Sequence, residues 1–217
     1  MTSEATVVES SERGGGALWR RILTVAWCSV LLGVAIEFVL VAIAAGSGTL
    51  KGLPPVVSDG LQKVSWSFLV CTGVACGTVA ARASAAMGVL GLVFGPLAFS
   101  VSKAVHKAAN QALSISTAAA SGPSPYWIAA IKGIEYGFLG ACVGWIASRR
   151  MGLGAYVAAG AVAGILFGGW ILLRMVTEAE PALAGPAIAI RAANEMLFPI
   201  GCAFVLYVAD ALQKRLR

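Results

Sequence analysis

Long apolar stretches separated by short polar connections run through this chain. Six of them are long enough, or nearly so, to cross the hydrocarbon core of a bilayer, which takes about 20 helical residues. The expected spans are 22–45, 64–82, 85–105, 126–148, 152–173 and 193–212. We therefore predict an all-α fold, a polytopic helical membrane protein with about six transmembrane helices.

The connections between these spans predict how the helices are paired. Two gaps, Ala83–Ser84 and Arg149–Met151, are so short that the helices on either side must form antiparallel hairpins. The other connections, Gly46–Lys63, His106–Pro125 and Val176–Ala192, are longer and contain proline and glycine turn signals. With six spans, the three long connections fall on one side of the membrane.

The basic residues predict which side that is. The side with the termini and short connections carries nine: Arg13, Arg20, Arg21, Arg82, Arg149, Arg150, Lys214, Arg215 and Arg217. The long-connection side carries six: Lys51, Lys63, Lys103, Lys107, Arg174 and Arg191. Because short basic segments stay on the cytoplasmic side, both termini are expected to be cytoplasmic.

Composition agrees with a membrane protein and excludes other classes. Hydrophobic residues make up 59% and charged residues 12%, against about 45–50% and about 25% in soluble domains. The mean hydropathy is +0.84. The net charge of +6 comes largely from residues at the ends of apolar runs, so no nucleic-acid partner is expected. The expected partner is the lipid bilayer, in a multi-pass protein of a cell membrane, with a bacterial inner membrane favoured.

We expect a disordered cytoplasmic tail over 1–21, one transmembrane domain over 22–213 and a basic cytoplasmic C-terminus over 214–217. A cleaved signal peptide or a twin-arginine export signal is the alternative reading of the first apolar run. That run is about 24 residues long, whereas the apolar core of a signal peptide has about 7–15. We therefore favour a retained first helix.

Glycines recur at four-residue spacing, which places them on one stripe of a helix and lets helix backbones approach closely in lipid. The main examples are Gly73, Gly77, Gly140, Gly144, Gly160, Gly164 and Gly168. These stripes indicate packing within the chain or, alternatively, a homo-oligomer interface. Span 152–173 has three of them and is expected to be central. Segments 64–105 and 126–173 also share glycine and alanine positions, which indicates either a parallel internal repeat or chance matching.

Ionisable residues inside the spans are the candidate functional residues, because charge in the bilayer core is costly unless it faces protein or water. Glu37, Lys132 and Glu135 lie at similar depth in the outer half. Lys132 and Glu135 are three residues apart and share a helix face. Arg191 and Glu195, at the outer end of the last span, complete a candidate polar cluster. The alternatives are a structural ion pair for Lys132 and Glu135 and a surface pair for Arg191 and Glu195.

Other chemistry is not indicated. Phosphate loops, metal-binding helices and nucleophile elbows are absent from the sequence, and neither a cofactor nor a metal is expected. The five cysteines are interpreted as small buried hydrophobic residues. The aromatic residues Trp19, Trp66, Tyr126 and Trp127 are interpreted as interface anchors.

The favoured function is a small transporter or channel for an ion or small polar solute, working through the outer-half polar cluster, and not an enzyme. The main alternative is a membrane-embedded structural or assembly subunit of a larger complex. An intramembrane enzyme is a third hypothesis, which would require a reactive nucleophile such as Cys142 or Cys202.

Overall fold

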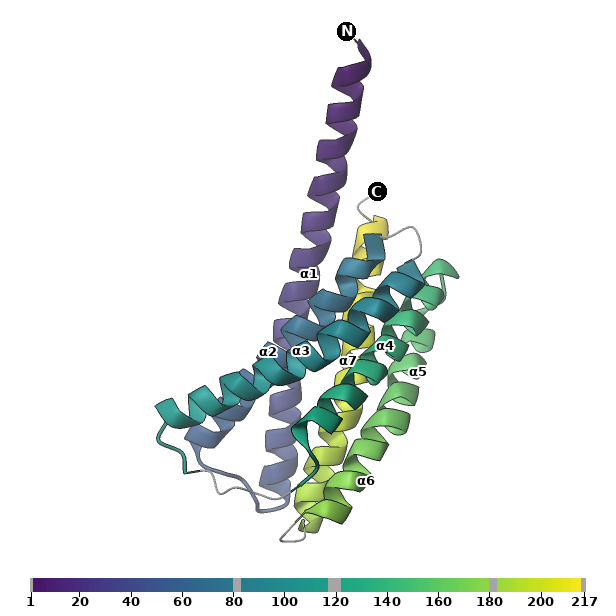
Figure 1. Cartoon of the computed structure of the whole chain (residues 1–217). Helices are drawn as coiled ribbons and strands as arrows, with labels where there is room; N and C mark the ends of the chain where they lie inside the picture. Colours follow the sequence, from purple (N-terminus) through teal and green to yellow (C-terminus); the bar gives the residue numbers. More distant parts are fainter. Residues whose placement is uncertain (1, 80–82, 117–121, 180–182, 216–217) are drawn as a thin grey trace.

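The computed structural model describes residues 2–79, 83–116, 122–179 and 183–215, and within these ranges the regular structure is entirely helical. The elements are α1 (Thr2–Gly46), α2 (Leu53–Cys76), the 3₁₀ turn η1 (Gly77–Val79), α3 (Ala83–Ala112), α4 (Pro125–Ser148), α5 (Leu153–Ala163), the π-helical segment η2 (Gly164–Gly168), α6 (Gly169–Glu178) and α7 (Gly185–Arg215). The predicted all-helical class is confirmed (Figure 1).

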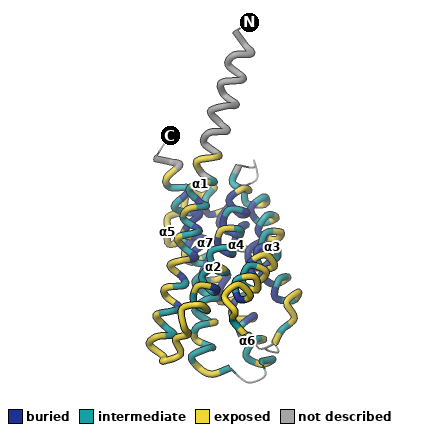
Figure 2. Tube along the Cα trace, turned by 90° about the vertical axis from the view of Figure 1, so that its left-hand side faces the viewer, coloured by how far each residue is buried: buried dark blue, intermediate teal, exposed yellow. Residues whose placement is uncertain are grey.

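Among the described residues, four helical stretches are long and apolar enough to cross a membrane: Ile22–Gly46, Ala83–Ala112, Leu153–Glu178 and Gly185–Leu212. The third of these joins α5, η2 and α6 into one continuous helix. Large apolar side chains on the outer faces are exposed, among them Trp27, Phe38 and Ile165. Figure 2 shows buried residues along the interior of the bundle and exposed ones around it. An apolar exterior of this kind is expected for helices that face lipid.

Two helices begin well before the predicted spans, because prolines in the long connections belong to helices. The connection expected over Gly46–Lys63 is shorter, since α2 begins at Leu53 with proline in its first turn. Proline is favoured at that position because the amide hydrogen it lacks has no partner in the first turn. In the same way α7 begins at Gly185, directly before Pro186. At its other end, α3 continues to Ala112.

The ends of the bundle are arranged as the hairpin prediction requires. The turn between α4 and α5 is tight, and Arg150 adopts a left-handed conformation there with φ of 52°. The C-terminal ends of α1, α3 and α6 lie toward the end of the bundle opposite both termini (Figure 1). We call this end the loop end and the opposite one the terminus end.

Some sequence predictions are left untested. The α1 helix is continuous from Thr2, and the described side chains of its first part, Trp19 and Arg20, are exposed. Disorder of the 1–21 tail therefore stays a prediction. Met1, Arg82 and residues 216–217 lie outside the described residues. Helices α2 and α4 run in the same direction (Figure 1), as a parallel repeat requires, but the repeat itself also stays a prediction.

The glycine stripes lie where helices approach most closely. A Cβ atom added to Gly77 would come within 2.6 Å of the Met87 backbone, and one on Gly144 within 2.5 Å of Ser84 Cα. A Cβ on Gly140 would meet the Met87 carbonyl, and one on Gly73 the Phe94 ring. Within the chain, these glycines thus pack α3 against α2 and α4.

The prediction that span 152–173 is central is not met. Its glycines face a single neighbour, α7: a Cβ on Gly160 would lie 2.5 Å from Ile200 Cα. The α5–η2–α6 helix stands at one side of the bundle (Figure 1). The stripe indicates one close helix pair, whereas a central position requires contacts on several faces.

Candidate functional site

Lys132 of α4 is the centre of a buried charged group. Its Nζ donates hydrogen bonds to Glu135 Oε2 at 2.7 Å and to Glu195 Oε2 of α7 at 2.6 Å. Lys132 is 6% exposed, Glu195 8% and Glu135 0%. We call these three residues the buried triad. Such charges are tolerated inside a protein only when they are paired and hydrogen-bonded.

A cavity of about 510 Å³ leads from the loop end to the buried triad. Thr49 and Lys51 of the α1–α2 connection line its mouth, and Lys132 and Glu195 lie at its inner end. Glu135 is not among its lining residues, because it lies behind Lys132. The volume falls within the range of about 300–1,000 Å³ that is usual for small-molecule sites.

Aromatic rings surround the ammonium group of Lys132. Its Nζ lies 5.7 Å from the ring centroid of Trp66 and 6.0 Å from that of Tyr136. Trp66 also makes edge contacts with Phe99 and Phe198. A cation over aromatic faces is stabilised by the ring quadrupole, and more strongly where water is excluded. These rings therefore hold the Lys132 side chain in place at the cavity floor.

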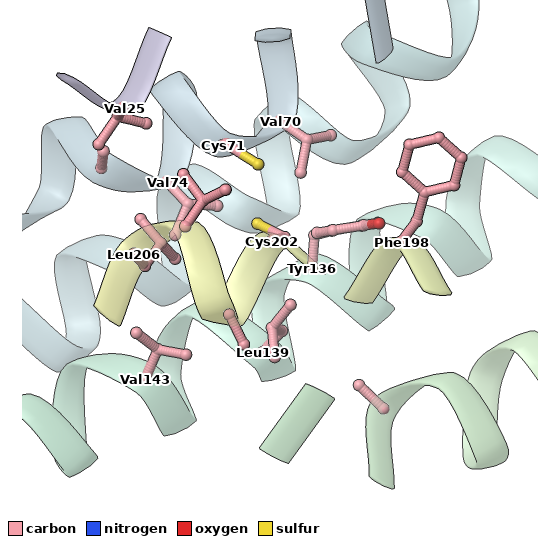
Figure 3. Close-up of a cluster of buried hydrophobic side chains, with 14 of the residues drawn as sticks. Val25, Val70, Cys71, Val74, Tyr136, Leu139, Val143, Phe198, Cys202 and Leu206 are labelled. Atoms are coloured by element: carbon pink, nitrogen blue, oxygen red, sulfur yellow. The ribbon is translucent and has the colours of Figure 1, made fainter. Parts of the chain in front are cut away.

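Beyond the buried triad, the bundle is closed toward the terminus end. Apolar side chains from α1, α2, α4 and α7 fill the space there: Val25, Val70, Cys71, Val74, Leu139, Val143, Cys202 and Leu206 (Figure 3). All of them are at most 2% exposed. Among the described residues, the polar route therefore enters from the loop end and stops at the buried triad.

The local structure of two helices makes room for Glu195. A Cβ on Gly168, at the end of the π segment, would lie 2.9 Å from Glu195 Cβ. Pro199 lies four residues after Glu195 in α7, so it supplies no amide hydrogen to the Glu195 carbonyl. Single π turns inside α-helices are frequent at functional sites. The small residues and the irregular turns together bring the Glu195 backbone close to η2 and leave its side chain facing Lys132.

Glu37 is not part of the buried triad. Its Oε2 lies 2.6 Å from Lys63 Nζ of α2, and both side chains are 13% exposed. Glu37 and Lys63 line a smaller cavity of about 90 Å³ that shares Lys51 and Asp59 with the main one. Glu37 thus lines only the smaller cavity, whereas Lys63 lines both.

Arg191 lines the main cavity but is not paired with Glu195. Its guanidinium contacts the sulfur of Met175 at 3.5 Å. Because Glu195 bonds to Lys132 instead, the expectation of an Arg191–Glu195 surface pair is wrong. Lys103 of α3 also lines the cavity, and its charge repels that of Arg191. Neither cation forms an ion pair with a described carboxylate.

Several site residues were not identified from the sequence. Trp66 was interpreted as an interface anchor, yet it is 7% exposed and packs on Lys132. Lys63 and Asp59 fall within the predicted connection Gly46–Lys63, although both lie in α2. Asp59 Oδ1 is 3.6 Å from His106 Nδ1. The hydrophobic pattern did not predict a helix in this part of α2, because the face that it turns toward the cavity is polar.

The cysteines differ in exposure. Cys71 and Cys202 are buried, as predicted, whereas Cys28 and Cys142 are partly exposed and Cys76 is exposed. All five are free thiols. In the part of the chain that the structure describes, no group of histidine, cysteine and acidic residues is arranged to hold a metal ion.

Comparisons of this chain with protein-family models, with curated proteins and with solved structures find no match.

Proposed function

We propose that this protein is a small transporter whose solute enters the cavity from the loop end and binds above the buried triad. The observation that carries this proposal is a charged cavity that reaches into an apolar helical bundle and ends at Lys132. Because the terminus end is closed by packed side chains, the arrangement fits a carrier open to one side better than a continuous channel. Carriers expose a central site to one side of the membrane at a time.

The proposed topology has six membrane crossings with both termini in the cytoplasm. Support comes from the position of both termini at one end of the bundle (Figure 1) and from the larger number of basic residues in the sequence at that end. The cavity would then open to the outside.

In a cysteine-free background, Gly122→Cys should react with an impermeant maleimide from outside intact cells. Gly152→Cys should react only after permeabilisation, and the reverse pattern would refute the orientation. Both glycines have free space around them.

The charge of the cavity favours an anionic solute. Its lining includes five basic side chains, those of Lys51, Lys63, Lys103, Lys132 and Arg191, and two acidic ones, those of Asp59 and Glu195. The formal balance is 5 − 2 = +3, and it is still 5 − 4 = +1 when Glu37 and Glu135, which pair with two of the lysines, are included. A cleft with one predominant sign of charge concentrates ligands of the opposite sign.

The test is solute uptake by purified protein in liposomes of neutral lipid, with small carboxylates, phosphate, cations and neutral solutes as the panel. We expect saturable uptake of an anion, weakened in Lys103→Gln and Arg191→Gln. Lys107→Gln is the matched control, since Lys107 is an exposed cation on α3 that does not line the cavity. The proposal fails if no solute is taken up. Stoichiometric co-purification with other membrane proteins, without any flux, would support a structural subunit instead.

A further inference from the structure

The buried triad contains one more acidic group than basic groups. Glu135 and Glu195 both bond to the single ammonium of Lys132. With all three residues ionised, the group carries a net charge of −1. Among the described residues, no second cation is paired with either carboxylate. An uncompensated negative charge on a buried group is strongly disfavoured, because burial removes most of the water that would stabilise it.

The two carboxyl groups have different surroundings. Glu195 lines the cavity and is 8% exposed. Glu135 is fully buried, and its second oxygen, Oε1, has no hydrogen-bond partner. An ionised carboxylate needs donors for both oxygens, and only Oε2 of Glu135 has one. Of the two, Glu135 is therefore the group that is more stable when protonated.

The helices around Glu135 offer no other charge to balance it. On α7, Glu195 bonds to the same ammonium, and the uncharged groups of Trp66, Cys71 and Cys202 lie around the neighbouring Tyr136 (Figure 3). Helix α3 presents small residues to this part of α4: a Cβ on Gly95 would lie 2.5 Å from the Lys132 carbonyl oxygen. The phenol of Tyr136 adjoins Glu135 in sequence and is buried as well. Lys132 is thus the one described cation that faces Glu135.

We propose that Glu135 holds one proton and that this proton is the coupling ion of the transporter. The proposal of coupling rests on the proposed function, whereas the protonation of Glu135 does not. After Glu135 has released its proton, a proton arriving from the cavity first binds the Glu195 carboxylate. Lys132 then donates one proton to Glu135 and accepts the one on Glu195, so that one proton moves inward and Lys132 remains an ammonium. The bound proton offsets the charge of an entering anion.

Infrared spectroscopy tests the protonation without any transport assay. At neutral pH the wild-type protein should show the C=O band of a protonated carboxylic acid, and Glu135→Gln should lack it. Glu37→Gln is the matched control and should keep the band, because Glu37 is paired with Lys63 outside the buried triad. The proposal is overturned if the band is absent from the wild type or persists in Glu135→Gln.

A second variant tests the charge count itself. In Glu195→Gln, one ammonium faces one carboxylate, so Glu135 should ionise and the band should disappear. If burial alone protonated Glu135, the band would persist in this variant. Because glutamine has nearly the shape of glutamic acid, both variants retain the packing, and the fold of each is checked by gel filtration before the spectra are compared.

Transport measurements test the coupling. With one proton per monovalent anion and no membrane potential, accumulation should rise about tenfold per unit of pH difference, because one pH unit is about 1.4 kcal/mol of proton free energy. Glu135→Gln should lose this accumulation but still exchange labelled for unlabelled solute. If wild-type uptake does not depend on the pH difference, the proposed proton coupling is overturned, but the protonation of Glu135 is not. Absence of any uptake would overturn the proposed function, and the infrared result would still decide the protonation.

Discussion

Removing the Lys132 ammonium should be among the most destabilising single changes in this chain. In Lys132→Met the side chain keeps its length and apolar stem, but Glu195 and Glu135 lose hydrogen bonds of 2.6 and 2.7 Å. Each hydrogen bond to a charged group contributes about 1.5–3 kcal/mol. Breaking a buried ion pair by removing one partner costs about 3–5 kcal/mol, since a charge stays behind without compensation. We expect the free energy of unfolding to fall by about 3–5 kcal/mol.

Thermal unfolding in detergent, followed by tryptophan fluorescence, measures this loss. For a chain of this size, 1 kcal/mol shifts the midpoint by about 2–4 °C, so a shift of about 6–20 °C is expected. Lys63→Met is the control, because the Lys63–Glu37 pair is 13% exposed on both sides and should lose less. Adding Glu195→Gln to Lys132→Met removes the orphaned charge and should restore part of the stability. A single variant within about 1 kcal/mol of the wild type would refute the reasoning, since buried pairs cost several times more.

Three further predictions follow from packing and exposure. Gly160→Val should destabilise the bundle by about 1–3 kcal/mol through overpacking, because a Cβ at this position would lie 2.5 Å from α7. Gly152→Val is the control: the space around Gly152 is open, so this variant should leave the free energy of unfolding unchanged in the same assay. In detergent, maleimide should label Cys76 much faster than Cys202, since the first thiol is exposed and the second is buried; equal rates, read by mass spectrometry of the peptides, would contradict this packing. Ser58→Ala removes the buried 2.6 Å hydrogen bond between α2 and Asn110 of α3. This loss should lower the free energy of unfolding by about 1 kcal/mol. An unchanged denaturant midpoint would show that this bond contributes nothing to stability.

Hydrophobic patterning predicted the helices and their hairpins because both depend on local sequence. The Lys132–Glu135 pair was predicted for the same reason, since residues three apart share a helix face. The bond between Lys132 and Glu195 joins residues 63 apart, and no local pattern states which helices are neighbours. Glu37 was grouped with the other buried charges by depth alone, and depth does not determine the helix that a side chain faces.

The predicted helix boundaries were wrong for a different reason. The spans were drawn where the sequence is apolar, but α2 begins 11 residues before position 64, at Leu53, through a polar segment that carries Asp59 and Lys63. Those residues line a cavity, so the helix is amphipathic toward a polar interior instead of toward water. Apolar runs therefore located the helices and missed the part of α2 that lines the cavity.

The π-helical segment Gly164–Gly168 changes the direction in which the side chains of the following helix, α6, point around the helix axis. A π turn accommodates one residue more than an α turn, and each residue of an α-helix advances about 100° around the axis. Everything after the segment is therefore rotated relative to an uninterrupted helix. Ile171, which is fully buried against Ile128 and Ile131, owes its inward position to that rotation. Deleting a single residue between 164 and 168 would let the segment close into a regular α-helix and leave Ile171 facing inward. Substitutions that made the segment α-helical at unchanged length would instead rotate α6 by about 100° and turn Ile171 away from Ile128 and Ile131.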